Sequence, residues 1–146
     1  MRISRKAEYA LRALVAMARQ AKSWQIHELS AQENIPIKFL EQILLALRHA
    51  GLLTSKRGVG GGYSLRKTPS EISVGEVIRI LDGPLAIVPC TVETPLEACT
   101  CPDRQTCPLR LMMTTVRRDL AGMLDGRTIQ DMLELAPQTG VIAFDI

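Results

Sequence analysis

A glycine-rich run over residues 58–62 restricts the possible folds of this chain more than any other segment. The run reads Gly-Val-Gly-Gly-Gly and separates two short strand patterns, at residues 52–56 and 63–67. Glycine tolerates positive φ angles and lets another backbone come close, so such runs form the tips of hairpins. The sequence therefore predicts a two-stranded β-hairpin with an adaptable tip.

Three helical patterns precede this hairpin. Ser4 can cap a first helix that reaches to about Ala21, a short helix is expected over residues 26–33, and Pro36 suits the first turn of a third helix. Gly51 stands where the third helix should end. Two helices joined by so short a turn and followed by a hairpin predict a mainly α fold of the winged helix-turn-helix type. The apolar positions expected to bury the third helix are Phe39, Leu40, Ile43, Leu44 and Leu47.

The second half of the chain carries a different pattern. Ser73 and Glu76 have capping-box spacing at the start of a helix that should end near Asp82. A longer helix is expected from about Pro108, and Thr128 can cap a last short one. We therefore divide the chain into a winged-helix domain (residues 1–82), a cysteine-bearing loop (83–107), a long helix with a C-terminal helix (108–136) and a flexible tail (137–146).

The long helix allows two interpretations, because its apolar face is broad. It can pair with a second copy and make a homodimer, or it can pack on its own subunit. The apolar positions are Leu109, Met112, Met113, Val116, Leu120, Met123 and Leu124.

Charge is divided unevenly along the chain. Residues 1–70 carry 12 Lys or Arg and 4 Glu, whereas residues 71–146 carry 6 Arg and 11 Asp or Glu. A basic half joined to an acidic half indicates a polyanion-binding module on a scaffold that does not bind the polyanion. Aromatic residues make up 3% of the chain, which argues against single-stranded nucleic-acid binding by base stacking. Double-stranded DNA is the expected partner.

The residues expected to meet DNA lie on the third helix and the hairpin. A recognition helix presents its N-terminal residues to base edges, and a wing lays basic side chains along phosphates or into a groove. Lys38 can contact phosphate or guanine, and Glu41 can accept from a cytosine amino group. The candidates on the hairpin are Lys56, Arg57, Gly60 and Gly61, the two glycines because they let backbone amides approach phosphates.

All four cysteines lie within one short segment, as Cys90, Cys99, Cys101 and Cys107. Thiolates suit iron–sulfur clusters or zinc, and adjacent ligands in a Cys-x-Cys favour a cluster modestly. Two alternatives stay open at this point. The cysteines can act as a thiol switch, or they can hold a zinc ion that only stabilises the loop.

Several motifs, taken in order, resemble the Rrf2 family of bacterial transcription regulators. They cover about residues 1–135 and include Glu8-Tyr9-Ala10-Leu11-Arg12, Phe39-Leu40-Glu41-Gln42, Arg57 with the glycine run and Tyr63, and Ser73-Val74-Gly75-Glu76-Val77-Ile78. The resemblance implies a homodimer that binds a palindromic operator, usually as a repressor. It places Lys38, Glu41 and Arg57 at the family's base-reading positions. It also implies control by an iron–sulfur cluster, two-iron or four-iron, that senses iron, nitric oxide or redox state.

The resemblance also suggests a ligand set, with one position open. Cys90, Cys101 and Cys107 best match the cluster cysteines of the family. IscR-like members have a histidine three residues after the last cysteine, where this chain has Arg110. The fourth ligand would then be Cys99, or Glu8 from the partner subunit, as NsrR-like members use an aspartate. Glu8 has an ordinary alternative, an ion pair with Arg12 four residues on. Members similar to CymR further suggest cysteine desulfurase as a protein partner.

Other function classes find no support in the sequence. It holds no Gly-Lys-Ser/Thr phosphate loop and no nucleophile set in a supporting context, so we expect neither an enzyme nor a small-molecule substrate. Charged residues among the first eight do not fit a signal peptide, and no stretch approaches the roughly 20 apolar residues of a membrane span. The expected location is the cytoplasm, without membrane contact.

Overall fold

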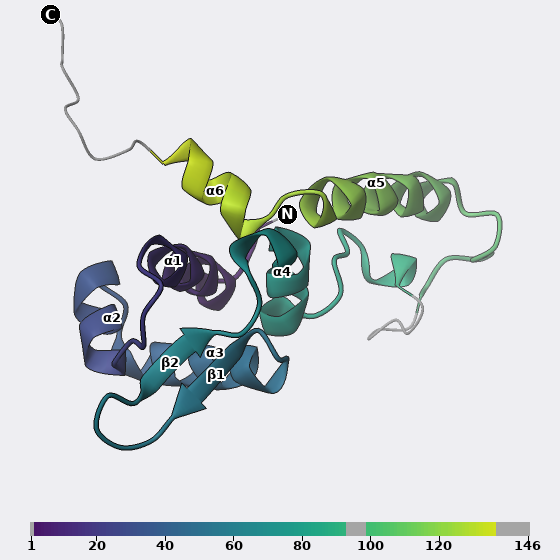
Figure 1. Ribbon diagram of the computed structural model, residues 1–146. Coiled ribbons are helices and arrows are strands. Elements are labelled where there is room, and N and C mark those ends of the chain that lie inside the picture. The colour runs from purple at the N-terminus through teal and green to yellow at the C-terminus, as the bar shows by residue number, and fades with distance from the viewer. Residues whose placement is uncertain (1, 93–98, 137–146) are drawn as a thin grey trace, which may run out of the picture.

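The computed structural model describes residues 2–92 and 99–136, and in this range the fold is a helical bundle with a small hairpin and a projecting helix (Figure 1). The tail at residues 137–146 lies outside the described residues. The elements, in chain order, are α1 (Arg5–Arg19), α2 (Ile26–Glu33), α3 (Ile37–His49), β1 (Leu53–Lys56), β2 (Gly62–Leu65), a 3₁₀ turn (Pro69–Glu71), α4 (Val74–Asp82), a second 3₁₀ turn (Pro89–Thr91), α5 (Pro108–Asp125) and α6 (Ile129–Leu135). This order confirms the winged helix-turn-helix prediction.

Capping side chains fix the helix starts that the sequence predicts. The Ser4 hydroxyl accepts from the Ala7 amide at 3.0 Å, and the Ser73 hydroxyl accepts from the Glu76 amide at 3.1 Å. Thr128 accepts from the Asp131 amide at 3.2 Å, and the Asp131 carboxylate accepts in return from the Thr128 amide. Each contact satisfies an amide that has no partner within its helix, so these short local motifs set the boundaries.

The core is aliphatic apart from Trp24, and it lies mainly among the first four helices, with Ile129 of α6 also buried in it. α1 contacts α2, α3, α4 and α6, and it buries alanines and a methionine on more than one side. Small side chains let the neighbouring helices come close around α1, so it is the central element of the bundle. The largest fully buried side chains are Trp24, Leu14, Met17, Leu29, Ile35, Leu40, Ile43, Leu44, Leu47, Leu52, Leu53 and Ile72.

Phe39 corrects one expectation for the third helix. Leu40, Ile43, Leu44 and Leu47 are fully buried, whereas Phe39 keeps 39% of its surface exposed. Residue 39 precedes this stripe by one position, which rotates it about 100° around the helix axis. Its ring instead makes a T-shaped contact with Tyr9 on α1, with centroids 6.1 Å apart and planes at 74°.

The hairpin is anchored to the bundle through Trp24. β1 and β2 pair antiparallel, with Leu53 opposite Leu65 and Lys56 opposite Gly62. Trp24 donates its amide to the Tyr63 carbonyl at 2.8 Å, and the Tyr63 amide donates back to the Trp24 carbonyl at 2.9 Å. The Trp24 backbone therefore holds the hairpin, while its buried indole donates to the Gln20 carbonyl at the end of α1 at 3.1 Å. The sequence did not reveal this attachment.

α5 lies to one side of the bundle and contacts it through its C-terminal end (Figure 1). Asp125 pairs with Arg79 of α4 at 2.6 Å, and a Cβ built on Gly75 would lie 2.1 Å from the Asp125 carboxylate. The Val74 amide also donates to the Arg127 carbonyl at 2.8 Å, just past the helix end. These contacts fix the direction in which α5 leaves the winged-helix domain. Among the described residues, no helix is both long enough and apolar enough to cross a membrane.

Candidate functional site

The first turns of α3 present polar side chains to solvent. Lys38 and Glu41 are exposed, as is Gln42 next to them, while Ile37 is half-buried. α3 begins at Ile37, with Pro36 in the cap position before it. An exposed N-terminal half is the part of a recognition helix that can enter the major groove.

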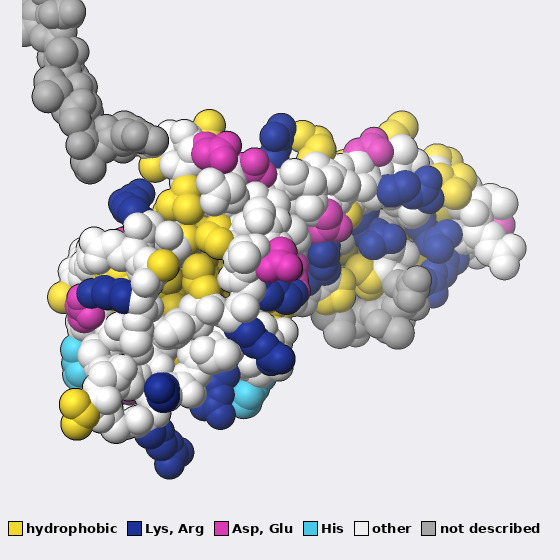
Figure 2. Space-filling view, viewed as in Figure 1, with side chains coloured by type: hydrophobic (Ala, Val, Ile, Leu, Met, Phe, Trp, Pro, Cys, Tyr) yellow, Lys and Arg dark blue, Asp and Glu magenta, His cyan; other side chains and the backbone are white. Residues whose placement is uncertain are grey.

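Basic side chains surround this helix and the hairpin. Lys56 and Arg57 are exposed at the end of β1, and Arg66 is exposed just after β2. Figure 2 shows Lys and Arg side chains gathered over the part of this face that the hairpin and α3 form. Lys67 differs, because its ammonium group pairs with Glu76 of α4 at 3.1 Å. Lys56, Arg57 and Arg66 are thus the exposed cationic side chains of the hairpin region that have no ion pair among the described residues.

The two candidate glycines of the hairpin differ in their surroundings. Gly60 is exposed, has a φ of +74°, and has open space where a side chain would be. Gly61 is buried, and a Cβ there would lie 2.3 Å from the Lys56 carbonyl oxygen. Its amide donates to the Gly58 carbonyl at 3.0 Å, and its carbonyl accepts from the Gln25 side chain. Gly61 therefore shapes the tip, and Gly60 is the more accessible of the two.

Two of the four thiols lie side by side at the start of α5. The Cys107 sulfur is 3.8 Å from the Cys101 sulfur, and Cys107 occupies the cap position of the helix. The Arg110 backbone N–H, more than the other neighbours, lowers the pKa of the Cys107 thiol. A hydrogen bond with Cys99, supported by one with Cys107, raises the pKa of Cys101 to about 11. Conversely, the Cys101 backbone N–H lowers the pKa of Cys99, so Cys99, Cys101 and Cys107 form one interacting set.

Cys90 reaches the same end of α5 by a different route. Its backbone carbonyl accepts from the Nε atom of Arg110 at 3.2 Å. Arg110 therefore ties the second 3₁₀ turn to the first turns of α5. Within residues 2–92 and 99–136, no three His, Cys, Asp or Glu side chains already converge as a metal site.

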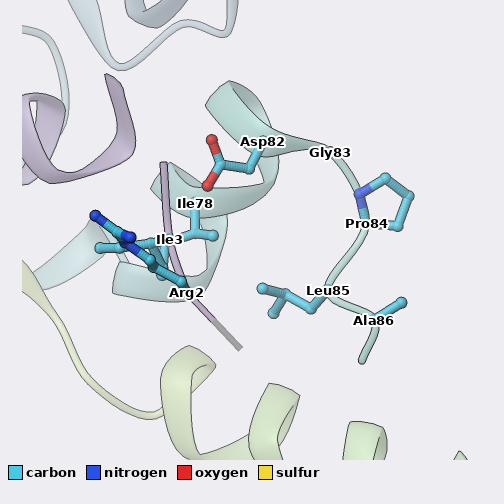
Figure 3. A pocket seen from close by; sticks show the side chains of 8 residues that line it. All are labelled: Arg2, Ile3, Ile78, Asp82, Gly83, Pro84, Leu85 and Ala86. Carbon is cyan, nitrogen blue, oxygen red and sulfur yellow. The ribbon is translucent and has the colours of Figure 1, made fainter. Parts of the chain in front are cut away.

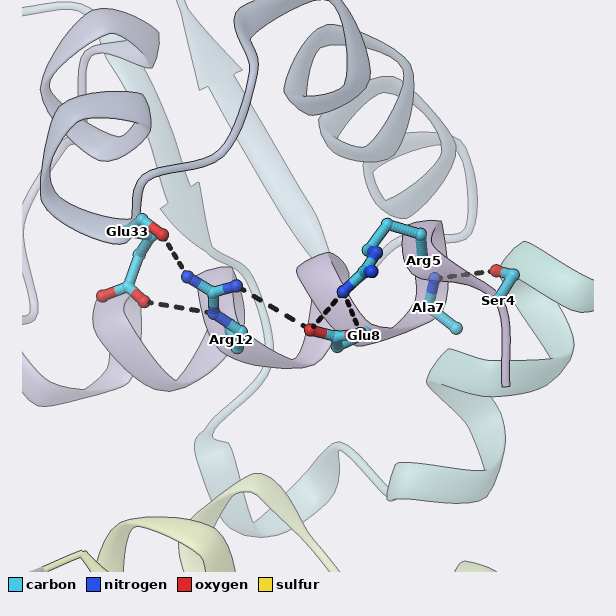
Figure 4. A network of polar contacts seen from close by, with 6 residues as sticks. All are labelled: Ser4, Arg5, Ala7, Glu8, Arg12 and Glu33. Atoms are coloured by element: carbon cyan, nitrogen blue, oxygen red, sulfur yellow. Dashed lines mark hydrogen bonds and ion pairs between the residues drawn. The ribbon is translucent and has the colours of Figure 1, made fainter. Parts of the chain in front are cut away.

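Glu8 lies in an ion-pair network on α1 (Figure 4). Its carboxylate contacts Arg5 at 3.1 Å and Arg12 at 3.9 Å. Arg12 in turn lies 3.8 Å from the Glu33 carboxylate and donates to the Glu33 carbonyl at the end of α2. Within one subunit, Glu8 thus has the ion pair with Arg12 that the sequence suggested, and Arg12 links α1 to the turn before α3.

A small hollow of about 170 Å³ lies where the N-terminal segment passes the end of α4 (Figure 3). Asp82 lines it, and its carboxylate accepts from both the amide and the hydroxyl of Ser4. Ser4 therefore caps α1 and also attaches the N-terminal segment to α4. The other lining residues are Arg2, Ile3, Ile78, Gly83, Pro84, Leu85 and Ala86.

Comparisons with known proteins agree with this arrangement. The Rrf2 family model, described as an iron-dependent transcriptional regulator, matches residues 3–135. The chain belongs to the Rrf2 family of transcriptional regulators. It is 38% identical over 137 residues to an rrf2-like HTH-type transcriptional regulator of Rhodobacter capsulatus, covering 90% of this chain and 91% of that protein. It is 33% identical over 135 residues to the regulator IscR of Serratia proteamaculans, covering 91% and 79% of the two chains.

A solved structure shows the same architecture. CymR of Bacillus subtilis, the global cysteine regulator of that organism, matches 93% of this chain and 98% of its own with a TM-score of 0.74 and 28% identity. Membership of the family makes this chain a DNA-binding transcriptional regulator of the winged-helix type and not an enzyme.

Sequence reasoning missed two residues that shape the candidate sites. Gln25 holds the hairpin tip through the Gly61 carbonyl, and nothing in its sequence context marks that contact. Asp103 accepts from the Gln105 amide at 2.8 Å and from the Thr106 hydroxyl at 2.7 Å, which turns the chain between two cysteines. The Asp-x-x-Thr spacing is a turn signal that could have identified this residue.

Proposed function

We propose that this Rrf2 regulator is a cytoplasmic homodimer that represses transcription from a palindromic operator under the control of an iron–sulfur cluster. Cys90, Cys101 and Cys107 would hold the cluster, with Cys99 or the partner's Glu8 as fourth ligand. The observation that carries the proposal is the pair of sulfurs, 3.8 Å apart, at the free end of the helix that contacts the winged-helix domain. Iron dependence in the description of the family gives independent support.

The donor set suits such a group. Tetrahedral coordination with metal–sulfur bonds of about 2.3 Å places two thiolate sulfurs on the same metal atom about 3.8 Å apart, as two cysteines on one iron of a two-iron cluster would be. Cys101 and Cys107 already have this separation, and Arg110 keeps the backbone at Cys90 close to the same end of α5. When bound, the cluster would supply a group that responds to iron supply, nitric oxide or oxidants.

α5 would carry the signal to the DNA-binding surface. The helix has 18 residues and spans about 27 Å, from Cys107 at one end to Asp125, which pairs with Arg79, at the other. α4 in turn packs against α1 and α3. A change in the cysteine segment can therefore alter the angle between α5 and the reading helix, which shifts the population of DNA-competent dimers.

The exposed side of α5 would form the dimer contact. Every residue of α5, all of which the structure describes, keeps part of its surface exposed. Figure 2 shows hydrophobic side chains reaching the surface along this helix. Four of these exposed residues, Leu109, Met112, Val116 and Met123, share one side of the helix by their spacing, which suits contact with a second copy of the same chain. The exposed apolar residues are Leu109, Leu111, Met112, Val116 and Met123.

At the operator, Glu41 and Arg57 would have different tasks. Arg57→Ala should weaken operator binding by about 1–3 kcal/mol if the guanidinium reads a base. Glu41→Ala should instead relax base preference, because removing an acceptor of a cytosine amino group lifts a constraint on the sequence. Selection from a random DNA library gives the site, and titrations over a salt series measure each variant. Unchanged affinity and preference in both variants would remove this surface from the reading role.

A second function is favoured by the structural similarity to CymR, a cysteine regulator. A sulfur separation of 3.8 Å fits a single zinc ion as well, and two adjacent thiols suit a switch that needs no metal. A protein partner such as cysteine desulfurase would then supply the signal. Under this alternative, elemental analysis finds zinc or no metal, and operator binding responds to thiol oxidation or to the added partner.

Anaerobic purification tests the main proposal directly. We expect a coloured protein with visible absorbance, with iron and acid-labile sulfide in equal amounts, and with operator affinity that changes when the cluster is removed. Size-exclusion chromatography of the same sample should give a dimer. Colourless protein without iron or sulfide, from cells grown with ample iron, would reject the cluster.

A further inference from the structure

The segment that joins Cys101 to Cys107 is folded into a compact turn. Asp103 accepts from the Gln105 amide at 2.8 Å, from the Thr106 amide at 3.4 Å, and from the Thr106 hydroxyl at 2.7 Å. A short aspartate side chain that bonds to the backbone two and three residues on reverses the chain direction. The turn returns the chain to its starting point, so the residues at its two ends come together.

The two sulfurs at the ends of this turn are 3.8 Å apart. A disulfide requires a sulfur–sulfur distance of about 2.05 Å, so the atoms must approach by a further distance of about 1.8 Å. Cys101 is exposed and Cys107 is partly exposed, so side-chain rotation is free to supply this approach and a small oxidant can reach both sulfurs. Because the turn already holds its two ends close together, closing the disulfide needs little further loss of chain entropy.

We propose that Cys101 and Cys107 form a reversible disulfide when the site holds no cluster, with a hydroperoxide as the oxidant. One sulfur attacks a peroxide oxygen, the O–O bond breaks, and a sulfenic acid forms as an alcohol or water leaves. The second sulfur then attacks the sulfenic sulfur, the S–S bond forms and water leaves. Two thiols and one hydroperoxide thus give one disulfide, one alcohol or water and one further water.

The bond would act on the same site as the cluster. Because Cys101 and Cys107 are two of the proposed ligands, the disulfide would block loading until a dithiol reductant reopens it. The inference rests on the proposed function for this consequence, whereas bond formation itself depends only on the two thiols and the turn. Asp103 is the positioning residue of the pair.

Trypsin offers a direct readout. Cleavage after Arg79, Arg104 and Arg110 separates a peptide of residues 80–104, with Cys90, Cys99 and Cys101, from a peptide of residues 105–110, with Cys107. Full-length protein is purified anaerobically, its iron and sulfide are measured, and the metal is stripped with a chelator and reductant. We expect a stoichiometric amount of hydrogen peroxide to link the two peptides, with loss of two hydrogen atoms and reversal by dithiothreitol.

Variants identify the bond. Cys90→Ser and Cys99→Ser should keep the link, Cys101→Ser should lose it, and Asp103→Ala should slow its formation about fivefold, the equivalent of one lost hydrogen bond. The inference is overturned by a link that survives Cys101→Ser, by a covalent dimer on a denaturing gel, or by free thiols after peroxide. An unchanged rate in Asp103→Ala would remove the positioning role. The iron and sulfide measured before stripping report on the proposed function separately, so either can fail alone.

Discussion

Replacing Cys107 with serine should abolish iron–sulfur binding. Cys107 occupies the cap position of α5, and its sulfur lies 3.8 Å from that of Cys101. Serine keeps the size of the side chain, but its hydroxyl is a poor ligand for iron compared with a thiolate. Cys107→Ser protein purified anaerobically should therefore lack visible absorbance, iron and sulfide, and its operator affinity should no longer change when a chelator is added.

Cys99→Ser is the matched control, because it removes a thiol from the same segment. Full retention of the cluster in Cys99→Ser would eliminate Cys99 as fourth ligand and leave Glu8, which Glu8→Ala then tests. Circular dichroism should show that Cys107→Ser keeps its helices, since Cys107 is half-exposed and outside the core. Undiminished iron and sulfide in Cys107→Ser would contradict the proposed site.

Replacing Gly62 with alanine should strongly lower the stability of the fold. Gly62 has a φ of +141°, and an added Cβ would lie 2.4 Å from the Trp24 carbonyl oxygen. L-residues rarely adopt this φ, and the clash is with backbone that is itself paired to the hairpin. We expect the free energy of unfolding to fall by about 3 kcal/mol, measured by urea denaturation. The hairpin would also detach from Trp24, so operator affinity should fall in Gly62→Ala even at temperatures where the protein is folded.

Gly60→Ala is the control that distinguishes the steric clash with Trp24 from the backbone strain of replacing any glycine that has a positive φ. Gly60 also has a positive φ, +74°, but a Cβ there meets nothing within 4 Å. Its substitution should cost about 1 kcal/mol from backbone strain alone. Equal destabilisation by the two variants would show that the contact with Trp24 is not what fixes the hairpin.

Local patterns were sufficient to predict the elements of the winged-helix domain. Capping serines at positions 4 and 73 and the glycine run all act through neighbouring residues, so the sequence carries them directly. Phe39 shows where this reasoning fails. Its apolar character predicted burial, but its ring stays partly exposed and makes a T-shaped contact with Tyr9, and that contact depends on how α1 crosses α3.

In the candidate sites, too, local sequence patterns reveal some features, whereas others depend on tertiary packing. The sequence indicated Lys38, Glu41, Lys56 and Arg57 because basic and glycine-rich patterns are visible along the chain, and all four side chains are exposed. Their role at the operator stays a prediction. The attachment of the hairpin to Trp24 and Gln25 joins residues that are far apart in sequence. No local pattern encodes such contacts, because they form only after the helices have packed.

By itself, the sequence determined that this chain is a winged-helix regulator of the Rrf2 family with four clustered cysteines. Periodicity, helix caps and motif order depend on residues that are close in the sequence, so they can be recognised without knowing how the helices pack. Tertiary structure decided that the Arg110 side chain contacts the backbone at Cys90 and that α5 meets the winged-helix domain through Asp125. These depend on distances between segments, which are set when the core closes and buried surfaces select one arrangement of the helices.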